Sequence, residues 1–533
     1  MEASQQQSIK DSEVGYPDTI TENGAPAFST TNKYCLDFFA SCIRDTPEDK
    51  IRNLITDSWS TDPRKTLAIL LHLRDCRSSK GNKGGKGEKL LTYFGLIWLR
   101  EFYPRTYLLN LPTFIEHGCL KDLCKLVELL HQKRCDKLGQ GTWVELELMA
   151  EFVREDIKKI NNHDDNSENK KIPVTLAGKW TPTESTHFDH RKNGNQAWLL
   201  AHILYPEKKG AMAMRQYRKD IGRLRENIKV VERLMSLSRF DEIEFATLPA
   251  KAHRLLRNAF NKRVPEKYNQ YLELLSQGKT KINSTGTQPH ELVNVYLTAG
   301  STLDQTIEGQ WTDLIKKLVS GQSLGSSLAI SDVSGSMEGL PMQVSIAFGI
   351  LLSQLQEEPF KNRLITFSEK PELHEVNGQT LFDKVKNVKN MAWGQNTNLL
   401  AVFKLIISFA KLNQVSQDKM IKTLFIFTDM QFDAAEPSNW KTTYQTIQDM
   451  YREANYLVPN IVFWNLRDTN ASFPTKSDTE GVALVSGFSS DLLKVFLSGD
   501  LTDMTPEKVM NLTIDPYLEL VIVDPLDLKK VDN

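Results

Sequence analysis

Residues 328–339 read LAISDVSGSMEG, and this stretch decides the fold of the C-terminal half of the chain. An apolar run ends at Asp332, and Ser334 and Ser336 follow at alternate positions. Alternate side chains of an extended segment point to the same side, so one carboxylate and two hydroxyls can be directed at one point. Gly335 permits a tight turn into the next helix. The stretch predicts a buried strand, a polar turn and a helix.

Short apolar runs alternate with helical patterns past residue 325, which is typical of an α/β protein. The strand candidates are SLAIS, RLITFS, ELHEV, TLFIFTDM, NIVFWNL and VALVSG. This alternation predicts a mainly parallel, doubly wound sheet with helices on both faces, in which ligands bind at the carboxyl ends of strands. One run ends at Asp332 and another at Asp429, so we expect these two carboxylates to meet at one edge of the sheet.

The predicted site contains only oxygen ligands, which suit a hard cation such as Mg²⁺ or Mn²⁺. Mg²⁺ keeps several waters and leaves room for an acidic side chain of a protein partner. The candidate metal residues are Asp332, Ser334, Ser336, Thr397 and Asp429.

This pattern of Asp-x-Ser-x-Ser, then a Thr, then an Asp resembles the metal-ion-dependent adhesion site of von Willebrand factor A domains. The resemblance covers about residues 325–500. It implies that Ser334 and Ser336 coordinate the ion directly and that Thr397 does so directly or through water. Asp332 and Asp429 would hold the ion, often through waters.

Two other interpretations of the stretch are open. DVSGSM can be a polar turn in which Ser334 or Ser336 caps the helix, although capping does not explain the distant Thr397 and Asp429. Asp429 and Asp433 imitate a motif of haloacid-dehalogenase-like phosphatases, but Ser334 stands where those enzymes need a carboxylate for proton transfer. No other nucleophile motif or nucleotide-binding loop is present, so we predict a protein that is not an enzyme.

Residues 35–160 and about 196–278 have apolar side chains at three- and four-residue steps, which predicts a stack of α-helices. The expected organisation is a disordered segment over 1–30, a helical domain over 31–300, an α/β domain over 325–500 and an extension over 501–533. The fold class is therefore α plus α/β.

Two basic stretches in the helical half are candidate contacts for phosphate groups of RNA. The first lies in the glycine-rich segment RDCRSSKGNKGGKGEK, and the second lies along a predicted helix, RQYRKDIGRLRENIK. Solvated surface charge explains either stretch about equally well. The candidate residues are Arg74, Arg77, Lys80, Lys83, Lys86, Lys89, Arg215, Lys219 and Arg223.

The glycine-rich segment, TENGAPAFSTTN and GKTKINSTGTQPHELV resemble the helical part of TROVE-like proteins, one group of which carries a C-terminal von Willebrand A-like domain. The resemblance implies a ring of HEAT-like helix pairs that binds small or misfolded RNAs. It points to an RNA-binding or ribonucleoprotein-assembly factor. The alternative is a metal-dependent protein-interaction scaffold without RNA binding.

Composition agrees with a two-part protein of 533 residues. Residues 301–533 carry 20 basic and 29 acidic side chains, whereas residues 1–300 carry 46 and 38. No apolar run is long enough to span a membrane and no secretory signal is visible, so we expect a cytoplasmic monomer. The six cysteines lie in the first quarter without disulfide or zinc spacing, so we expect thiols.

Overall fold

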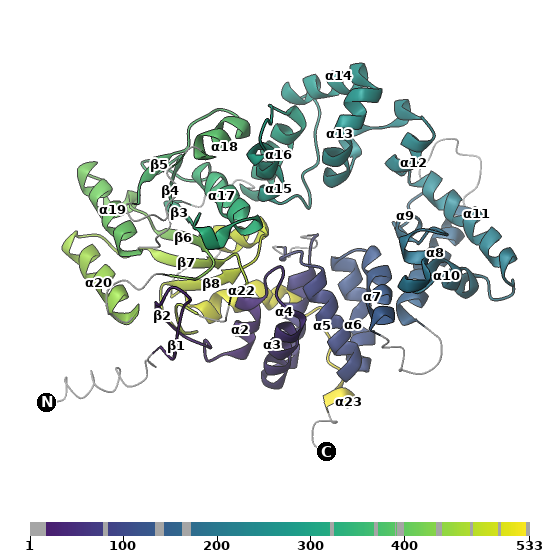
Figure 1. Cartoon of the computed structure of the whole chain (residues 1–533), viewed down its shortest axis with the longest axis horizontal. Helices are drawn as coiled ribbons and strands as arrows, with labels where there is room; N and C mark the ends of the chain where they lie inside the picture. The colour runs from purple at the N-terminus through teal and green to yellow at the C-terminus, as the bar shows by residue number, and fades with distance from the viewer. Residues whose placement is uncertain are drawn as a thin grey trace.

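The computed structural model describes residues 17–77, 84–133, 143–162, 172–319, 325–366, 371–389, 391, 399–432, 440–469, 473–498 and 503–528. Helices dominate the first 319 residues, and a six-stranded sheet with helices on both faces forms the C-terminal part (Figure 1). The prediction of a helical part followed by an α/β part is therefore confirmed at this level.

The sheet has the strand order β5-β4-β3-β6-β7-β8, and only β5 is antiparallel to its neighbour. Apart from the edge strand β5, its strands are almost fully buried, as expected for a sheet covered on both faces. Their bounds are Ser327–Ser331 (β3), Arg363–Thr366 (β4), Leu373–Glu375 (β5), Thr423–Thr428 (β6), Asn460–Asn465 (β7) and Val482–Ser486 (β8).

Side chains of each strand alternate between two apolar cores, one on each face of the sheet. One face packs against α17 (Leu340–Ser353) and α22 (Pro506–Leu518), and the other against α19 (Leu399–Leu412) and α20 (Trp440–Glu453). The remaining helices of this part are α18 (Leu381–Lys389) and α21 (Leu493–Ser498). Helices on both faces make this a doubly wound sheet.

The order of the strands reverses between β3 and β6, which are neighbours at the centre of the sheet. From β3 the chain proceeds to β4 and β5 on one side, and from β6 it proceeds to β7 and β8 on the other. Open α/β sheets bind ligands in the crevice at such a switch point, beyond the carboxyl ends of the strands. Asp332 follows β3 and Asp429 follows β6, so both predicted carboxylates lie at this position.

Consecutive helices of the N-terminal part pack on one another along an arch (Figure 1). Its first helices are α2 (Tyr34–Ser41), α3 (Glu48–Thr61), α4 (Pro63–Arg74), α5 (Leu90–Phe102), α6 (Pro104–His117), α7 (Lys121–Gln132) and α8 (Val144–Asn161). They continue as α9 (Ala177–Trp180), α10 (Gln196–Leu204), α11 (Ala211–Asn227), α12 (Val231–Ser236), α13 (Ala250–Arg263), α14 (Pro265–Ser276), α15 (Pro289–Leu297) and α16 (Gln305–Val319).

Both ends of the arch contact the α/β part. At the N-terminal end, α2 packs on β8 and α4 packs on α22. At the other end, α15 packs on α17 and α18. The intervening helices lead from one contact to the other around a central opening between the ribbons (Figure 1).

The prediction of disorder over residues 1–30 is wrong for residues 17–30, and residues 1–16 lie outside the described residues. β1 (Thr19–Ile20) and β2 (Pro26–Ala27) form a small hairpin that lies against the α/β part. Phe28 exchanges two backbone hydrogen bonds with Phe473, at 2.9 and 2.8 Å. Thr21 Oγ1 donates to the carbonyl of Phe432 at 2.9 Å.

The predicted C-terminal extension also contributes to the packed structure. The Tyr517 hydroxyl on α22 donates to Asp75 Oδ2 at 2.8 Å. Further along, α23 (Pro525–Leu528) packs on α6, and Asn110 Nδ2 donates to the carbonyl of Ile522 at 2.6 Å. The end of the described chain thus fastens the α/β part to the first helices of the arch.

Candidate functional site

The turn after β3 is held by its own polar groups. Ser334 donates its backbone N–H to Asp332 Oδ1 at 2.9 Å, and the Oγ atoms of Ser334 and Ser336 lie 3.0 Å apart. Asp332 is 1 % exposed, Ser334 is buried and Ser336 is half-buried. The chain therefore presents a buried carboxylate and two adjacent hydroxyls in one turn. Gly335–Met337 form a 3-10 helix, however, and not the extended segment that the alternation predicts.

Asp429 lies at the end of the neighbouring strand and is also 1 % exposed. Its Oδ1 accepts the backbone N–H of Gln431 at 3.1 Å, whereas its buried Oδ2 has no hydrogen-bond partner among the described residues. Burial of a carboxylate oxygen without a hydrogen-bond donor costs free energy. An atom of this kind therefore indicates a ligand, such as a cation or an ordered water.

Two residues that the sequence analysis missed complete the surroundings of the turn. Thr428 Oγ1 donates to Asp332 Oδ2 at 2.8 Å and so connects the ends of β6 and β3. The Arg467 guanidinium, just after β7, donates to the carbonyl of Ser336. The rule that selected Asp332 and Asp429, a polar residue at the carboxyl end of a strand, applies to both positions and could have found them.

The two carboxylates influence one another. The pKa of Asp332 is raised to about 6, mainly because burial disfavours the charged form and then because of the negative charge of Asp429. Hydrogen bonds from Ser334 and Thr428 act in the opposite direction. Without a cation, this pair therefore favours retention of a proton on Asp332.

We expect the free energy of unfolding of the metal-free protein to contain a component that decreases as the pH rises from about 4 to about 6. In this interval Asp332 is protonated in the folded state. In the unfolded chain its pKa has the ordinary value of 3.8, so the proton has been released. Stability therefore declines as the pH rises. Chemical unfolding in EDTA, followed across this interval, measures the effect. Asp332→Asn should remove that component, and an identical pH dependence in wild type and variant would contradict the assignment.

The remaining predicted metal residue, Thr397, lies outside the described residues, as does Asp433 of the phosphatase interpretation. Four of the five predicted metal residues are described, and they lie at the ends of the two adjacent strands β3 and β6. Among the described residues, no group of three or more His, Cys, Asp or Glu side chains could hold a metal ion. A cation here would therefore depend on the serine hydroxyls as well as on the two carboxylates.

The first basic stretch differs from the prediction at two positions. Arg74 is 1 % exposed, and its Nη2 lies 2.6 Å from Asp122 Oδ2. Lys86 is also buried, and its Nζ donates to the carbonyls of Phe39 and Cys42 and to Ser486 Oγ, at 2.5, 3.1 and 2.6 Å. The prediction that these two side chains contact phosphate is wrong, because both are buried and bind protein groups in the interior.

Residues 84–89 of the glycine-rich segment do not form an open loop. Lys86 and Glu88 donate their backbone N–H groups to the carbonyls of His72 and Leu73, at the end of α4. A Cβ atom on Gly85 would lie 2.0 Å from the carbonyl oxygen of His72, so this close approach requires glycine. Arg77 and Lys89 are exposed at the two ends of the segment, and Lys80 and Lys83 lie outside the described residues.

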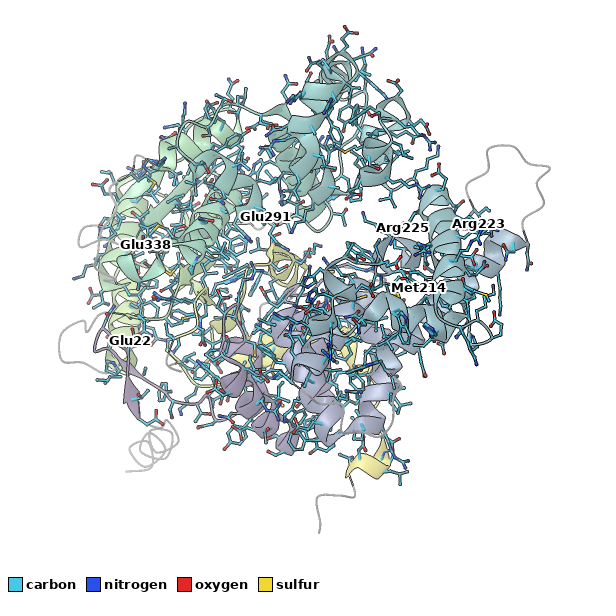
Figure 2. All side chains as sticks on the ribbon, turned by 45° about the vertical axis from the view of Figure 1, so that its right-hand side comes forward. Glu22, Met214, Arg223, Arg225, Glu291 and Glu338 are labelled. Atoms are coloured by element: carbon cyan, nitrogen blue, oxygen red, sulfur yellow. The ribbon has the colours of Figure 1, made fainter. Side chains whose placement is uncertain are left out.

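The second basic stretch forms α11, as predicted, and its candidate residues are exposed. Arg215 and Lys219 form no ion pair within the described residues, whereas Arg223 lies 3.6 Å from Asp220. Figure 2 shows Arg223 and Glu338, which follows the polar turn, at opposite ends of the molecule. The structure therefore does not bring the two kinds of predicted site together.

The described cysteines, Cys35, Cys42, Cys76, Cys119 and Cys124, form no disulfide. Among the described helices, none combines the length and the apolar character needed to cross a bilayer.

The fold and the site define a two-part protein in which a helical arch joins a doubly wound α/β part with a pair of buried carboxylates at its switch point. Residues 21–145 and 144–324 match the family model described as domain of unknown function DUF2828, and residues 326–517 match domain of unknown function DUF7788. The chain belongs to the DUF2828 family.

A curated relative is "Uncharacterized protein L728" of Acanthamoeba polyphaga mimivirus. The two proteins are 36% identical over 522 residues, which cover 94% of this chain and 88% of the relative. The relative therefore spans both the helical and the α/β part.

Proposed function

We propose that this protein is a non-enzymatic scaffold whose α/β part is von Willebrand A-like and binds Mg²⁺ or Mn²⁺ at the switch point. Ser334 and Ser336 would supply hydroxyl ligands, Asp332 and Asp429 would hold the ion, and Thr397 is the predicted fifth residue. The observation that carries this proposal is the buried Asp429 Oδ2, which has no partner among the described residues.

The donor set fits a hard divalent cation. All candidate ligands are oxygen atoms, and a divalent charge would offset the repulsion between the two buried carboxylates. The protein supplies only part of an octahedron, which leaves positions for water and for an acidic side chain of a protein partner. The site would therefore act by adhesion, with the cation shared between two proteins.

A hydrolytic role has less support. The position two residues after Asp332 is Ser334, whose hydroxyl cannot supply the proton that a carboxylic acid gives to a leaving group. Adhesion requires no such group. We also propose, as the sequence suggests, that the protein works as a cytoplasmic monomer.

Adhesion is tested by immobilising the full-length protein and presenting it with a cell extract in Mg²⁺ or in EDTA. A retained protein is then purified and its binding is measured again by calorimetry. We expect binding that requires Mg²⁺, that is lost in Ser334→Ala and that persists in the control Ser408→Ala, an exposed serine on α19. Binding that is the same in EDTA or in Ser334→Ala would contradict adhesion through the ion.

RNA binding is a second candidate function, favoured by the exposed cations Arg215, Lys219 and Arg223 on α11. Residues four positions apart lie on one side of a helix, where they can follow a phosphate backbone. The burial of Arg74 and Lys86 removes part of the support for this candidate, so protein adhesion is the better supported function.

Reversal of two of these charges, Arg215→Glu with Lys219→Glu, should weaken the binding of a fluorescein-labelled hairpin RNA by about tenfold or more at low salt. It should also reduce the dependence of log Kd on log salt, because fewer counterions are released. Fluorescence anisotropy measures both effects. The matched control is Lys404→Glu with Lys411→Glu, two exposed lysines on α19. Equal affinity for RNA in the two double variants would contradict a binding face on α11.

A further inference from the structure

A cleft of about 720 Å³ lies where the helical arch meets the α/β part. Three segments that are far apart in the chain line it: residues 75–77 and 85–90 from the start of the arch, residues 284–291 from its end, and residues 488–494 after β8. In Figure 2, Glu291 on one wall lies near the middle of the molecule, between the arch and the α/β part. This junction cleft exists only because both ends of the arch contact the α/β part.

Positive charge dominates the junction cleft. Arg77, Lys89 and Lys251 line it and are exposed, and within the described residues none of them is paired with a carboxylate. Buried Lys86 also lines it, and its hydrogen-bond partners are two carbonyls and a hydroxyl.

The lining carboxylates are mostly neutralised by the protein itself. Glu88 lies 2.9 Å from Arg44, Glu291 lies 2.9 Å from Arg254, and Asp491 is paired with Lys494. Asp75 accepts hydrogen bonds from the Tyr517 hydroxyl and the Arg77 backbone N–H, at 2.8 and 2.9 Å. Asp45, which also lines the cleft, is exposed. Arg77, Lys89 and Lys251 outnumber it, so the net charge of the cleft is positive and favours an anion.

Two buried polar atoms on the wall have no hydrogen-bond partner among the described residues. They are Thr287 Oγ1 and His290 Nδ1, on side chains that are 6 % and 5 % exposed. Thr287 lies just before the N-cap of α15 and His290 lies in its first turn, where Glu291 accepts the backbone N–H of Gln288 at 3.1 Å. Polar groups this deeply buried are almost always hydrogen-bonded, so these two atoms indicate that a polar ligand or water belongs in the junction cleft.

The aromatic residue of the cleft does not offer a free face for stacking. Phe488 is 3 % exposed, the Arg44 guanidinium lies 4.9 Å from its ring centre, and the His290 ring packs edge-on against it at 5.8 Å. A ligand would therefore be recognised by its charge and its hydrogen-bonding oxygens. Lysine and arginine side chains with a hydroxyl group are the usual protein contacts of phosphate.

We propose that the junction cleft binds the phosphate group of a nucleotide or of an RNA end. Lys89 from the start of the arch and Lys251 from α13 would supply charge, Arg77 would add a guanidinium, and Thr287 would donate its hydroxyl to a phosphate oxygen. This site is separate from the proposed cation site and does not depend on it. Because the ligand would touch both ends of the arch and the α/β part, it would stabilise their contact.

Binding is measured on the full-length protein in EDTA, which excludes the cation site. The probes are AMP and a 5′-phosphorylated RNA oligonucleotide labelled at its other end, with adenosine and the unphosphorylated oligonucleotide as controls. We expect binding that requires the phosphate. If AMP binds, the ligand is a free nucleotide, whereas binding of the phosphorylated oligonucleotide alone identifies an RNA end. The proposal is overturned if neither phosphorylated probe binds, or if the controls bind equally well.

Variants locate the binding in the cleft. Lys251→Glu should weaken it by about tenfold or more, because a charge-assisted contact is replaced by repulsion. The matched control is Lys262→Glu, an exposed lysine further along the same helix, α13. Thr287→Val, which keeps the shape of the side chain and removes the hydroxyl, should weaken binding about threefold or more. Equal affinities in Lys251→Glu and Lys262→Glu, or an unchanged affinity in Thr287→Val, would contradict the assigned contacts.

Discussion

Replacing Arg74 by methionine is expected to lower the free energy of unfolding by about 3–5 kcal/mol, the usual result of breaking a buried ion pair. Arg74 Nε and Nη2 lie 2.8 and 2.6 Å from Asp122 Oδ2, and both side chains are less than 5 % exposed. Methionine fills a similar space but leaves the carboxylate in the interior without its counter-charge. Chemical unfolding, followed by tryptophan fluorescence, measures the loss.

The surroundings of Asp122 indicate that this pair fixes a helix junction. The carboxylate also accepts from the Tyr93 hydroxyl at 2.7 Å and from the Cys119 backbone N–H at 3.0 Å. It thereby connects α4, α5 and the turn before α7. A suitable control is Arg105→Met on α6, an exposed residue for which we expect a change within about 0.5 kcal/mol. An unchanged unfolding curve for Arg74→Met would show that the pair does not hold these helices.

The second large effect has the opposite sign. Asp332→Asn should raise the free energy of unfolding of the metal-free protein at neutral pH, by on the order of 1–3 kcal/mol. The amide removes a buried charge whose pKa is raised to about 6 by burial and by Asp429. It keeps a carbonyl oxygen that can accept the backbone N–H of Ser334. Unfolding in EDTA measures the gain.

A gain of stability on removal of a buried charge is typical of a site that is built for a ligand. Asp383→Asn provides the control, because its carboxylate is exposed at the start of α18 and its pKa is lowered by hydrogen bonds from Thr380. We expect no gain there. If Asp332→Asn were less stable than wild type in EDTA, the two carboxylates would stabilise the fold. The proposal that they repel one another in a site built for a ligand would then be contradicted.

The position of the candidate site could be predicted from the sequence because it depends on local pattern. A buried strand followed by an alternating polar turn places Asp332 at a strand end, and the next central strand does the same for Asp429. In a parallel sheet, the carboxyl ends of neighbouring strands lie at the same edge. The same rule applies to Thr428 and Arg467, but their partners, Asp332 Oδ2 and the carbonyl of Ser336, depend on register and on loop path, which the structure shows.

The basic stretches show where the sequence was insufficient. A lysine or arginine on a helical pattern is normally exposed, and nothing local distinguishes Arg74 and Lys86 from exposed Lys89. Their burial follows from partners far along the chain, Asp122 for one and Ser486 for the other. Residues 17–30 are similar: their sequence is polar, and their order comes from contacts with Phe432 and Phe473.

We propose that the turn after β3 and the end of β6 together bind one divalent cation. Electron paramagnetic resonance of added Mn²⁺ measures this directly on the purified full-length protein. We expect one saturable site for which Mg²⁺ competes, lost in Asp332→Ala and Ser334→Ala and retained in Asp383→Ala. If Mn²⁺ binds without saturation, or equally to wild type, Asp332→Ala and Ser334→Ala, the four oxygen-bearing residues at the switch point do not form a cation site.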